Sequence, residues 1–314
     1  MTRQFRCPSP PVSEMIKLRG LRGHAALRAN LLRLGVFCLL GLLLTPAGPA
    51  FGQSSGDASS GGQSAAEVAR ALSDPNNTLG QLLFPVDYKR FDGALPGADT
   101  QNGFAVNFQP AFPVPLGGGL NFFARPLIPL VVSQPVYTPN GGFEGKGGLG
   151  DISFDLGVGK TFSSGLVVIG GMVGSTPTAT DEALGTGQWL LGPEALVAFV
   201  RPWGVIGGLV TQSWRVAGEE GDTSITGGQY FYTFNLPADG WQIFGQPTFS
   251  YNHNAGDGDK LAFPVGGGLS KTSIVGATPM KFALQYWYYV VTPDTFGVRH
   301  QLRFGYTAVV PLPW

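Results

Sequence analysis

The residue types that usually support catalysis or metal binding are scarce in this chain, and their spacing is poor. Only His253 and His300 of the three histidines lie beyond position 52, and neither has a second His or Cys at metal-ligand spacing. Both cysteines, Cys7 and Cys38, lie within the first 52 residues, so the rest of the chain has no thiol. We therefore predict no metal, no cofactor and no catalytic residue.

Two further groups of residues suggest ligands only in part. The stretch Gly157–Thr161 ends in Gly-Lys-Thr, but a phosphate-binding loop needs a glycine five residues before Gly159, where Phe154 stands. The end of a strand is the better interpretation. Acidic clusters could bind divalent cations near lipopolysaccharide, with a solvated loop as the alternative. These clusters are Asp181-Glu182, Glu219–Asp222 and Asp257–Asp259.

A larger set of polar residues would lie on one common face if the chain forms strands. Alternate side chains of a strand point to opposite faces, and here the charged residues share the face opposite the apolar one. In a transmembrane barrel that face lines the lumen, where the charges select solutes or hold the barrel closed through ion pairs. The predicted lumen-facing residues are Arg125, Asp155, Arg215, Gln246, Gln285, Arg299 and Arg303, with Trp287 and Tyr289 beside them and Glu194 added despite the ambiguous parity of its strand.

The last stretch of the chain shows this alternation most clearly. From Val298 onward every second residue is apolar or aromatic, while Arg299, Gln301, Arg303 and Thr307 occupy the other face. Such a strand ending in an aromatic residue is typical of the signal by which bacterial outer-membrane barrels are recognised for insertion. The expected assembly signal is Tyr306, Ala308, Val310, Leu312 and Trp314.

The first 52 residues have the pattern of a secretory signal peptide. Seven basic residues precede the apolar run 34–44, which is too short for a membrane helix of about 20 residues, and small residues follow before Gln53. Seven of the 20 basic residues but only one of the 20 acidic residues lie in this leader, so the remainder carries a net charge of −6. A nucleic-acid partner is therefore not expected.

Three further regions are expected after the leader. Residues 53–64 form a flexible Gly/Ser-rich linker. Residues 65–81 contain a short helix, which is a periplasmic segment or a plug; a disordered lead-in is the alternative. Residues 82–314 form the barrel. Alternation and turn residues predict twelve strands there, with ten or fourteen as alternatives: 82–92, 103–113, 119–132, 149–161, 166–176, 186–200, 204–216, 224–235, 241–251, 260–270, 279–291 and 297–312.

The connections between these strands alternate in length, as a barrel with short periplasmic turns requires. The inner connections are short except the one at 271–278, and the outer connections include a long loop at 133–148.

A series of short motifs follows in a characteristic order along the chain. They are 107–114, 125–129, 148–151, 177–180, 185–189, Gly192-Pro193, Trp203-Gly204 and Gln246-Pro247. In their order and spacing, over about residues 72–314, the sequence resembles the family of proposed outer-membrane transporters named for the meta-pathway of phenol degradation. The resemblance implies a β-barrel that passes small organic, in part aromatic, compounds; it supplies no catalytic residues and no defined substrate.

Together these patterns predict an all-β protein, a transmembrane antiparallel barrel of about 12 strands with a short N-terminal helix, in the outer membrane of a Gram-negative bacterium. We expect a passive channel for small organic molecules. A lipid-modifying barrel enzyme and a closed structural or adhesive barrel are the alternatives. The expected partners are the lipid bilayer, lipopolysaccharide, the barrel-assembly machinery and small organic solutes.

Overall fold

The computed structural model describes residues 64–314. The expected signal peptide, 1–52, and all but the last residue of the expected linker, 53–64, lie outside the described residues. Within residues 64–314, no helix combines the length and the apolar character that crossing a membrane would need.

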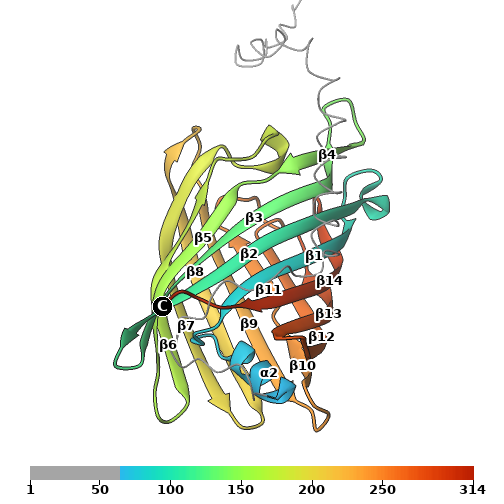
Figure 1. Cartoon of the computed structure of the whole chain (residues 1–314). Coiled ribbons are helices and arrows are strands. Elements are labelled where there is room, and N and C mark those ends of the chain that lie inside the picture. Colours follow the sequence, from blue (N-terminus) through green and yellow to red (C-terminus); the bar gives the residue numbers. More distant parts are fainter. Residues whose placement is uncertain (1–63) are drawn as a thin grey trace, which may run out of the picture. The chain divides into compact units, whose positions relative to one another are not determined.

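The described chain forms one antiparallel sheet that closes on itself (Figure 1). Apart from β4 with β5 and β10 with β11, strands that follow each other along the chain pair, and the first strand pairs with the last. The strands are β1 (Gly80–Asp92), β2 (Asn102–Gly117), β3 (Leu120–Tyr137), β4 (Phe143–Leu149), β5 (Ile152–Thr161), β6 (Leu166–Thr176), β7 (Gln188–Arg201), β8 (Gly204–Gly218), β9 (Ser224–Asn235), β10 (Trp241–Gly245), β11 (Thr248–Asn252), β12 (Leu261–Val275), β13 (Thr278–Val291) and β14 (Gly297–Val310).

Fourteen segments make a twelve-stranded barrel because two of them are extra pieces of strands. β10 and β11 both lie between β9 and β12, so they form one interrupted strand. β4 and β5 pair with successive parts of the same neighbour, β3. The predicted closed barrel of twelve strands is thus confirmed.

Two predicted connections are wrong in detail. The outer loop expected at 133–148 is mostly strand, because β3 and β4 continue as a hairpin whose tip is residues 138–142. The long inner connection expected at 271–278 is a two-residue turn, since β12 runs on to Val275. Gly276 accommodates this tight turn with a φ of 63°.

Prolines explain two further differences from the predicted strands. The expected strand 241–251 is interrupted at Gln246-Pro247, and the expected strand 297–312 ends at Val310, before Pro311 and Pro313. Proline has no N–H to donate to a ladder of hydrogen bonds. The indole Nε1 of Trp314 instead donates to the carbonyl oxygen of Pro113 at 2.8 Å.

Large apolar side chains cover the outer face of the barrel. In water such a belt would drive association, whereas in a bilayer it matches the acyl chains. Exposed tryptophans lie near both ends of the strands, where an interfacial girdle is expected. Members of the belt and girdle are Val168, Met172, Trp189, Val197, Phe199, Trp203, Ile206, Val210, Trp214, Trp241, Leu269, Leu284, Leu302 and Phe304.

The interior combines an apolar side with polar walls. Buried apolar residues from β3, β6, β7 and β8 pack together near the inner turns, with Val200, Leu209 and Phe231 against them. This cluster is Phe123, Val167, Ile169, Leu196, Ala198 and Val205. The cluster fills part of the lumen near the inner turns. The remaining open space therefore lies farther from these turns and toward the polar walls.

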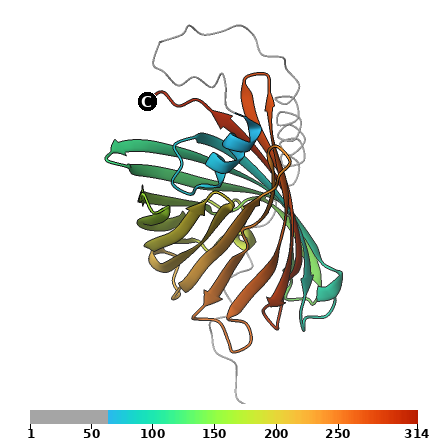
Figure 2. The ribbon, with the colours of Figure 1, turned by 90° about the horizontal axis from the view of Figure 1, so that it is seen from below.

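The helix α2 (Ala65–Ser73) packs at the inner mouth against β8, β10, β12 and β13 (Figures 1 and 2). It begins with a capping box, in which Ser64 and Glu67 exchange side-chain and backbone hydrogen bonds. Val68 and Ala69 are its most buried residues. The expected short N-terminal helix is confirmed, although it ends at Ser73.

Candidate functional site

The barrel encloses a cavity of about 440 Å³ above the inner segment, which we define as residues 72–79. Four predicted residues line it: Arg125, Asp155, Gln246 and Arg303. Apolar side chains contribute the rest of the wall, among them Phe123, Leu196, Leu209 and Phe231. The cavity therefore offers charged, amide and hydrocarbon surface at once.

Arg125 and Asp155 form an ion pair across β3 and β5. The sheet register places them directly opposite each other, and Nε lies 2.8 Å from Oδ1. The guanidinium carbon also lies 5.1 Å from the centre of the Phe123 ring. Because Nε makes the bond to Asp155, the Nη groups are left to face the cavity; no hydrogen bond engages them within residues 64–314.

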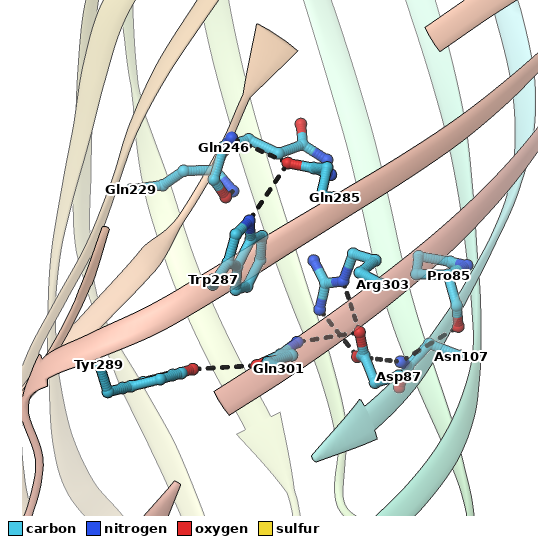
Figure 3. A network of polar contacts seen from close by, with 10 residues as sticks. All are labelled: Pro85, Asp87, Asn107, Gln229, Gln246, Gln285, Trp287, Tyr289, Gln301 and Arg303. Carbon is cyan, nitrogen blue, oxygen red and sulfur yellow. Dashed lines mark hydrogen bonds and ion pairs between the residues drawn. The ribbon is translucent and has the colours of Figure 1, made fainter. Parts of the chain in front are cut away.

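A second ion pair, between Asp87 and Arg303, joins the first strand to the last (Figure 3). Arg303 donates from Nε at 2.6 Å and from Nη2 at 2.8 Å, so the pair is bidentate. Asp87 is 3% exposed and accepts two more bonds, from Gln301 at 2.9 Å and Asn107 at 3.2 Å. This carboxylate is fully coordinated, which is what a buried charge requires.

Aromatic side chains extend this network along β13. The guanidinium of Arg303 lies 4.6 Å from the ring centre of Trp287, and Tyr289 donates its hydroxyl proton to Gln301 at 3.0 Å. Trp287 donates from Nε1 to Gln285 Oε1 at 3.3 Å, and the same oxygen accepts from the backbone N–H of Gln246 at 3.2 Å (Figure 3). Gln285 is therefore a buried support for Gln246.

Glu194 is also on the inner face, which resolves the ambiguous parity of its strand. It lies opposite Thr211 of β8 and is 4% exposed. Neither carboxylate oxygen has a hydrogen-bond partner among residues 64–314. It does not line the cavity itself.

Arg215 and Arg299 lie away from the cavity, toward the outer mouth. Arg299 binds Asp92 at 3.1 Å and the carbonyl oxygen of Tyr289 at 3.1 Å. Arg215 donates to the carbonyl oxygen of Glu219, in the loop after β8, at 3.3 Å. The eight predicted residues thus comprise four that line the cavity, two that lie toward the outer mouth, and Glu194 and Gln285, which are buried on the inner face without lining the cavity.

The inner segment forms the floor of the cavity and crosses the inner mouth. On one side, the helix α2 that leads into it is held to the wall: Gln242 of β10 donates to the carbonyl oxygen of Ala69 at 3.1 Å, and Asp239 accepts from the N–H of Ala66 at 2.9 Å. On the other side, Asn121 of β3 donates to the carbonyl oxygen of Asn76 at 2.9 Å, and Asn76 donates to Thr161 of β5 at 3.0 Å. The chain is thus held to opposite walls.

Burial affects one titratable group of this floor. Desolvation raises the pKa of the Asp74 carboxyl, and a hydrogen bond from the Asn76 N–H at 2.9 Å opposes the shift.

Several of these residues were not predicted from the sequence. Asp87 and Gln229 belong to the inner network but were not predicted, whereas Asn107 and Gln301 were placed on the polar face of their strands without being singled out as site residues. Asp87 could have been found from its strand, because Phe84, Val86 and Tyr88 mark the outer face around it. Its partner could not, since alternation gives a face but no register.

The residues that the sequence analysis considered and rejected as catalytic or phosphate-binding have ordinary structural roles. His300 faces outward and shares a 2.7 Å hydrogen bond with the hydroxyl of Tyr286. The stretch Gly157–Thr161 is the end of β5, as expected. Residues 64–314 contain no group of three or more His, Cys, Asp or Glu residues placed to hold a metal ion.

Comparison with known proteins gives the fold. No protein-family model and no curated protein matches the sequence. Among solved structures, an outer membrane channel from Pseudomonas putida F1 matches with a TM-score of 0.54 at 11% identity, over 74% of this chain and 96% of that chain. The NanC porin matches with a TM-score of 0.45 at 10% identity, over 74% and 100% of the two chains. The Pseudomonas putida toluene transporter TodX gives 0.32 at 9% identity, over 77% and 93%.

The first of these matches, together with the apolar outer belt and the polar cavity, defines the class. The chain has the fold of an outer-membrane channel barrel.

Proposed function

We propose that the protein is a passive outer-membrane channel for small organic molecules that carry one polar or anionic end. The observation that carries the proposal is the composition of the cavity, in which Arg125 and Arg303 face apolar residues such as Phe123 and Phe231. A guanidinium attracts a carboxylate or phenolate, and the apolar wall accommodates a ring or alkyl group. No energy source or cofactor enters this proposal.

The further expectations from the sequence belong to the same proposal. A leader ending before Gln53 would direct export, and the terminal residues from Tyr306 to Trp314 would be recognised by the assembly machinery. Lipopolysaccharide would surround the outer rim. Membership of the phenol meta-pathway family is consistent with the aromatic and apolar cavity wall, and the inner segment would act as a partial plug.

Liposome swelling and planar-bilayer conductance with the leaderless protein test the proposal. We expect benzoate to enter faster than an uncharged sugar of similar size, and the preference to fall as salt screens the arginines. Arg125→Gln leaves Asp155 in the cavity, so it should move the reversal potential toward cation selectivity. Asp155→Asn is the matched control and should move it toward anions.

Equal entry of benzoate and sugar, with both variants unchanged in selectivity, would remove the cavity from the pathway. A parent protein that neither swells liposomes nor conducts would support a closed structural barrel. Hydrolysis of lipid by the pure protein would support the enzyme.

A further inference from the structure

The outer face of the barrel changes in character where β1, β14 and β13 lie side by side (Figure 1). In the row of side chains nearest the outer loops, Arg90 lies opposite His300, and His300 lies opposite Tyr288. The next row toward mid-height is Tyr88, Leu302 and Tyr286, and the third is Val86, Phe304 and Leu284. The face thus passes from basic through tyrosine-rich to apolar.

A β-bulge adds a second arginine to the first row. The register shifts between Arg90 and Phe91, so that Arg299 of β14 is an extra residue without a partner on β1. Its Cζ lies 6.0 Å from the ring centre of Tyr288, and its Nε lies 3.1 Å from Oδ2 of Asp92. Both neighbours face outward, because each follows a buried residue in its strand. The bulge therefore carries the Arg299 side chain to the outer face, so the prediction from alternation that it lines the lumen is wrong.

The basic side chains meet at a pocket of about 440 Å³, which we call the outer pocket. It is lined by Arg90, Phe91, Asp92, Asp99, Arg299 and His300. Asp92 is already paired with Arg299. Arg90 binds only the backbone carbonyl oxygen of Asp99, at 3.2 Å, so its charge has no carboxylate partner within residues 64–314.

Each basic side chain of the outer pocket is held by the protein and still keeps a free donor. Arg90 uses Nη2 for its one bond, which leaves Nε and Nη1, and Arg299 uses Nε and Nη1, which leaves Nη2. His300 shares Nδ1 with the hydroxyl of Tyr286 at 2.7 Å. When that hydroxyl donates to Nδ1, the ring proton lies on Nε2. No group of residues 64–314 accepts a hydrogen bond from these remaining nitrogens, so three side chains offer donors to a ligand.

We propose that the outer pocket binds a terminal phosphate of lipopolysaccharide in the outer leaflet. A phosphate monoester has three terminal oxygens, one for each basic side chain, and hydrogen bonds between ionised partners are the strong ones. The phosphodiester of a phospholipid has only two such oxygens. Toward mid-height, the C–H face of a sugar ring can pack on Tyr88 and Tyr286, and acyl chains can lie against Phe304 and Leu284. The outer pocket is on the outside of the barrel, so its ligand does not depend on whether the lumen conducts.

Binding of lipid A, the phosphorylated glycolipid of lipopolysaccharide, to the leaderless protein in detergent micelles tests the site. Native mass spectrometry measures the bound fraction as bisphosphorylated lipid A is added. EDTA is present, so that no divalent ion bridges the phosphate to a carboxylate. Arg90→Gln removes a charge that no carboxylate balances, and the Kd should rise about tenfold. Asp99→Asn removes a like charge from the outer pocket, and the Kd should fall.

Arg201→Gln is the matched control. This arginine also lies on the outer face, but at the inner end of β7, with its guanidinium carbon 5.7 Å from the ring centre of Phe199. Its loss should leave the Kd unchanged. Heat-modifiable migration on a gel checks that each variant is folded. Folded Arg90→Gln and Asp99→Asn that both bind like the parent, or an equal loss in Arg201→Gln, would overturn the site.

Three other ligands identify what the outer pocket recognises. Dephosphorylated lipid A, phosphatidylglycerol and inorganic phosphate should each bind the parent about tenfold more weakly or worse. Equal binding of dephosphorylated lipid A would overturn the phosphate site, and equal binding of phosphatidylglycerol would overturn the assignment to lipopolysaccharide. Inorganic phosphate that displaces lipid A at equal concentration would make the outer pocket a site for free anions instead. A parent that binds lipid A but does not conduct in phosphatidylcholine bilayers would refute only the proposed channel.

Discussion

Asp87 shows how a buried charge in this barrel depends on its partners. The carboxylate receives four hydrogen bonds, two of them from Arg303. An ionised carboxylate without such partners would be costly at that degree of burial. The pair is therefore a structural element as well as part of the cavity wall.

Removing one partner of this pair should be costly. Arg303→Gln leaves Asp87 buried with only amide donors, and we expect a loss of about 3–5 kcal/mol in the free energy of unfolding. Urea unfolding in lipid vesicles, followed by tryptophan fluorescence, measures it. The double variant Asp87→Asn with Arg303→Gln should recover most of the loss. A single variant as stable as the parent would mean that the pair contributes nothing to stability.

Neighbouring residues of β2 should respond oppositely to the same charge. Phe108 faces outward and stacks on Phe84 at 5.1 Å, whereas Gln109 lines the cavity. Phe108→Arg places a charge in lipid near mid-height and should destabilise the barrel by about 2–4 kcal/mol, while Gln109→Arg should be tolerated. The same unfolding assay compares the two. Equal effects would contradict the assignment of faces on β2.

At the scale of elements, the inner segment has a pH dependence with a definite sign. Burial raises the pKa of Asp74, so the docked segment binds a proton more readily than a free one. Docking is therefore favoured below the ordinary aspartate pKa and weakens as pH rises through the raised value. Conductance should therefore increase as the pH rises above the ordinary aspartate pKa of about 4.

Asp74→Asn separates this effect from other titrations in the lumen. The amide oxygen can still accept from Asn76, but it carries no charge, so the segment should stay docked and the variant should conduct less than the parent at neutral pH. A variant with the parent's pH profile would exclude Asp74 as the cause.

The sequence predicted most strands because their alternation is a local property, but it could not predict two features that depend on neighbouring strands, β4 and the partners of the arginines. β4 has the sequence Phe143-Glu-Gly-Lys-Gly-Gly-Leu149, which shows no alternation and becomes a strand through pairing with β3. The interruption at Pro247 could have been suspected from the proline alone. The partners of Arg125 and Arg303 required the register, which alternation does not give.

The whole molecule offers a test of assembly. Trp314→Asp should lower the amount of folded barrel in the outer membrane, because it removes the terminal aromatic residue and its bond to Pro113. Trp314→Phe keeps an aromatic ring and should assemble nearly as well. Quantifying the folded, heat-modifiable band in membrane fractions checks both. Normal levels of the aspartate variant would show that the terminal residue is dispensable.

The pairing of Asp87 with Arg303 also constrains the order in which the barrel forms. These residues are 216 positions apart and meet only when β1 and β14 come together. An open sheet leaves an aspartate and an arginine unpaired at its two edges, and closure brings them together in the last step. The energy of the pair is thus available only to the completed barrel, and contacts of such long range are the slowest to form during folding.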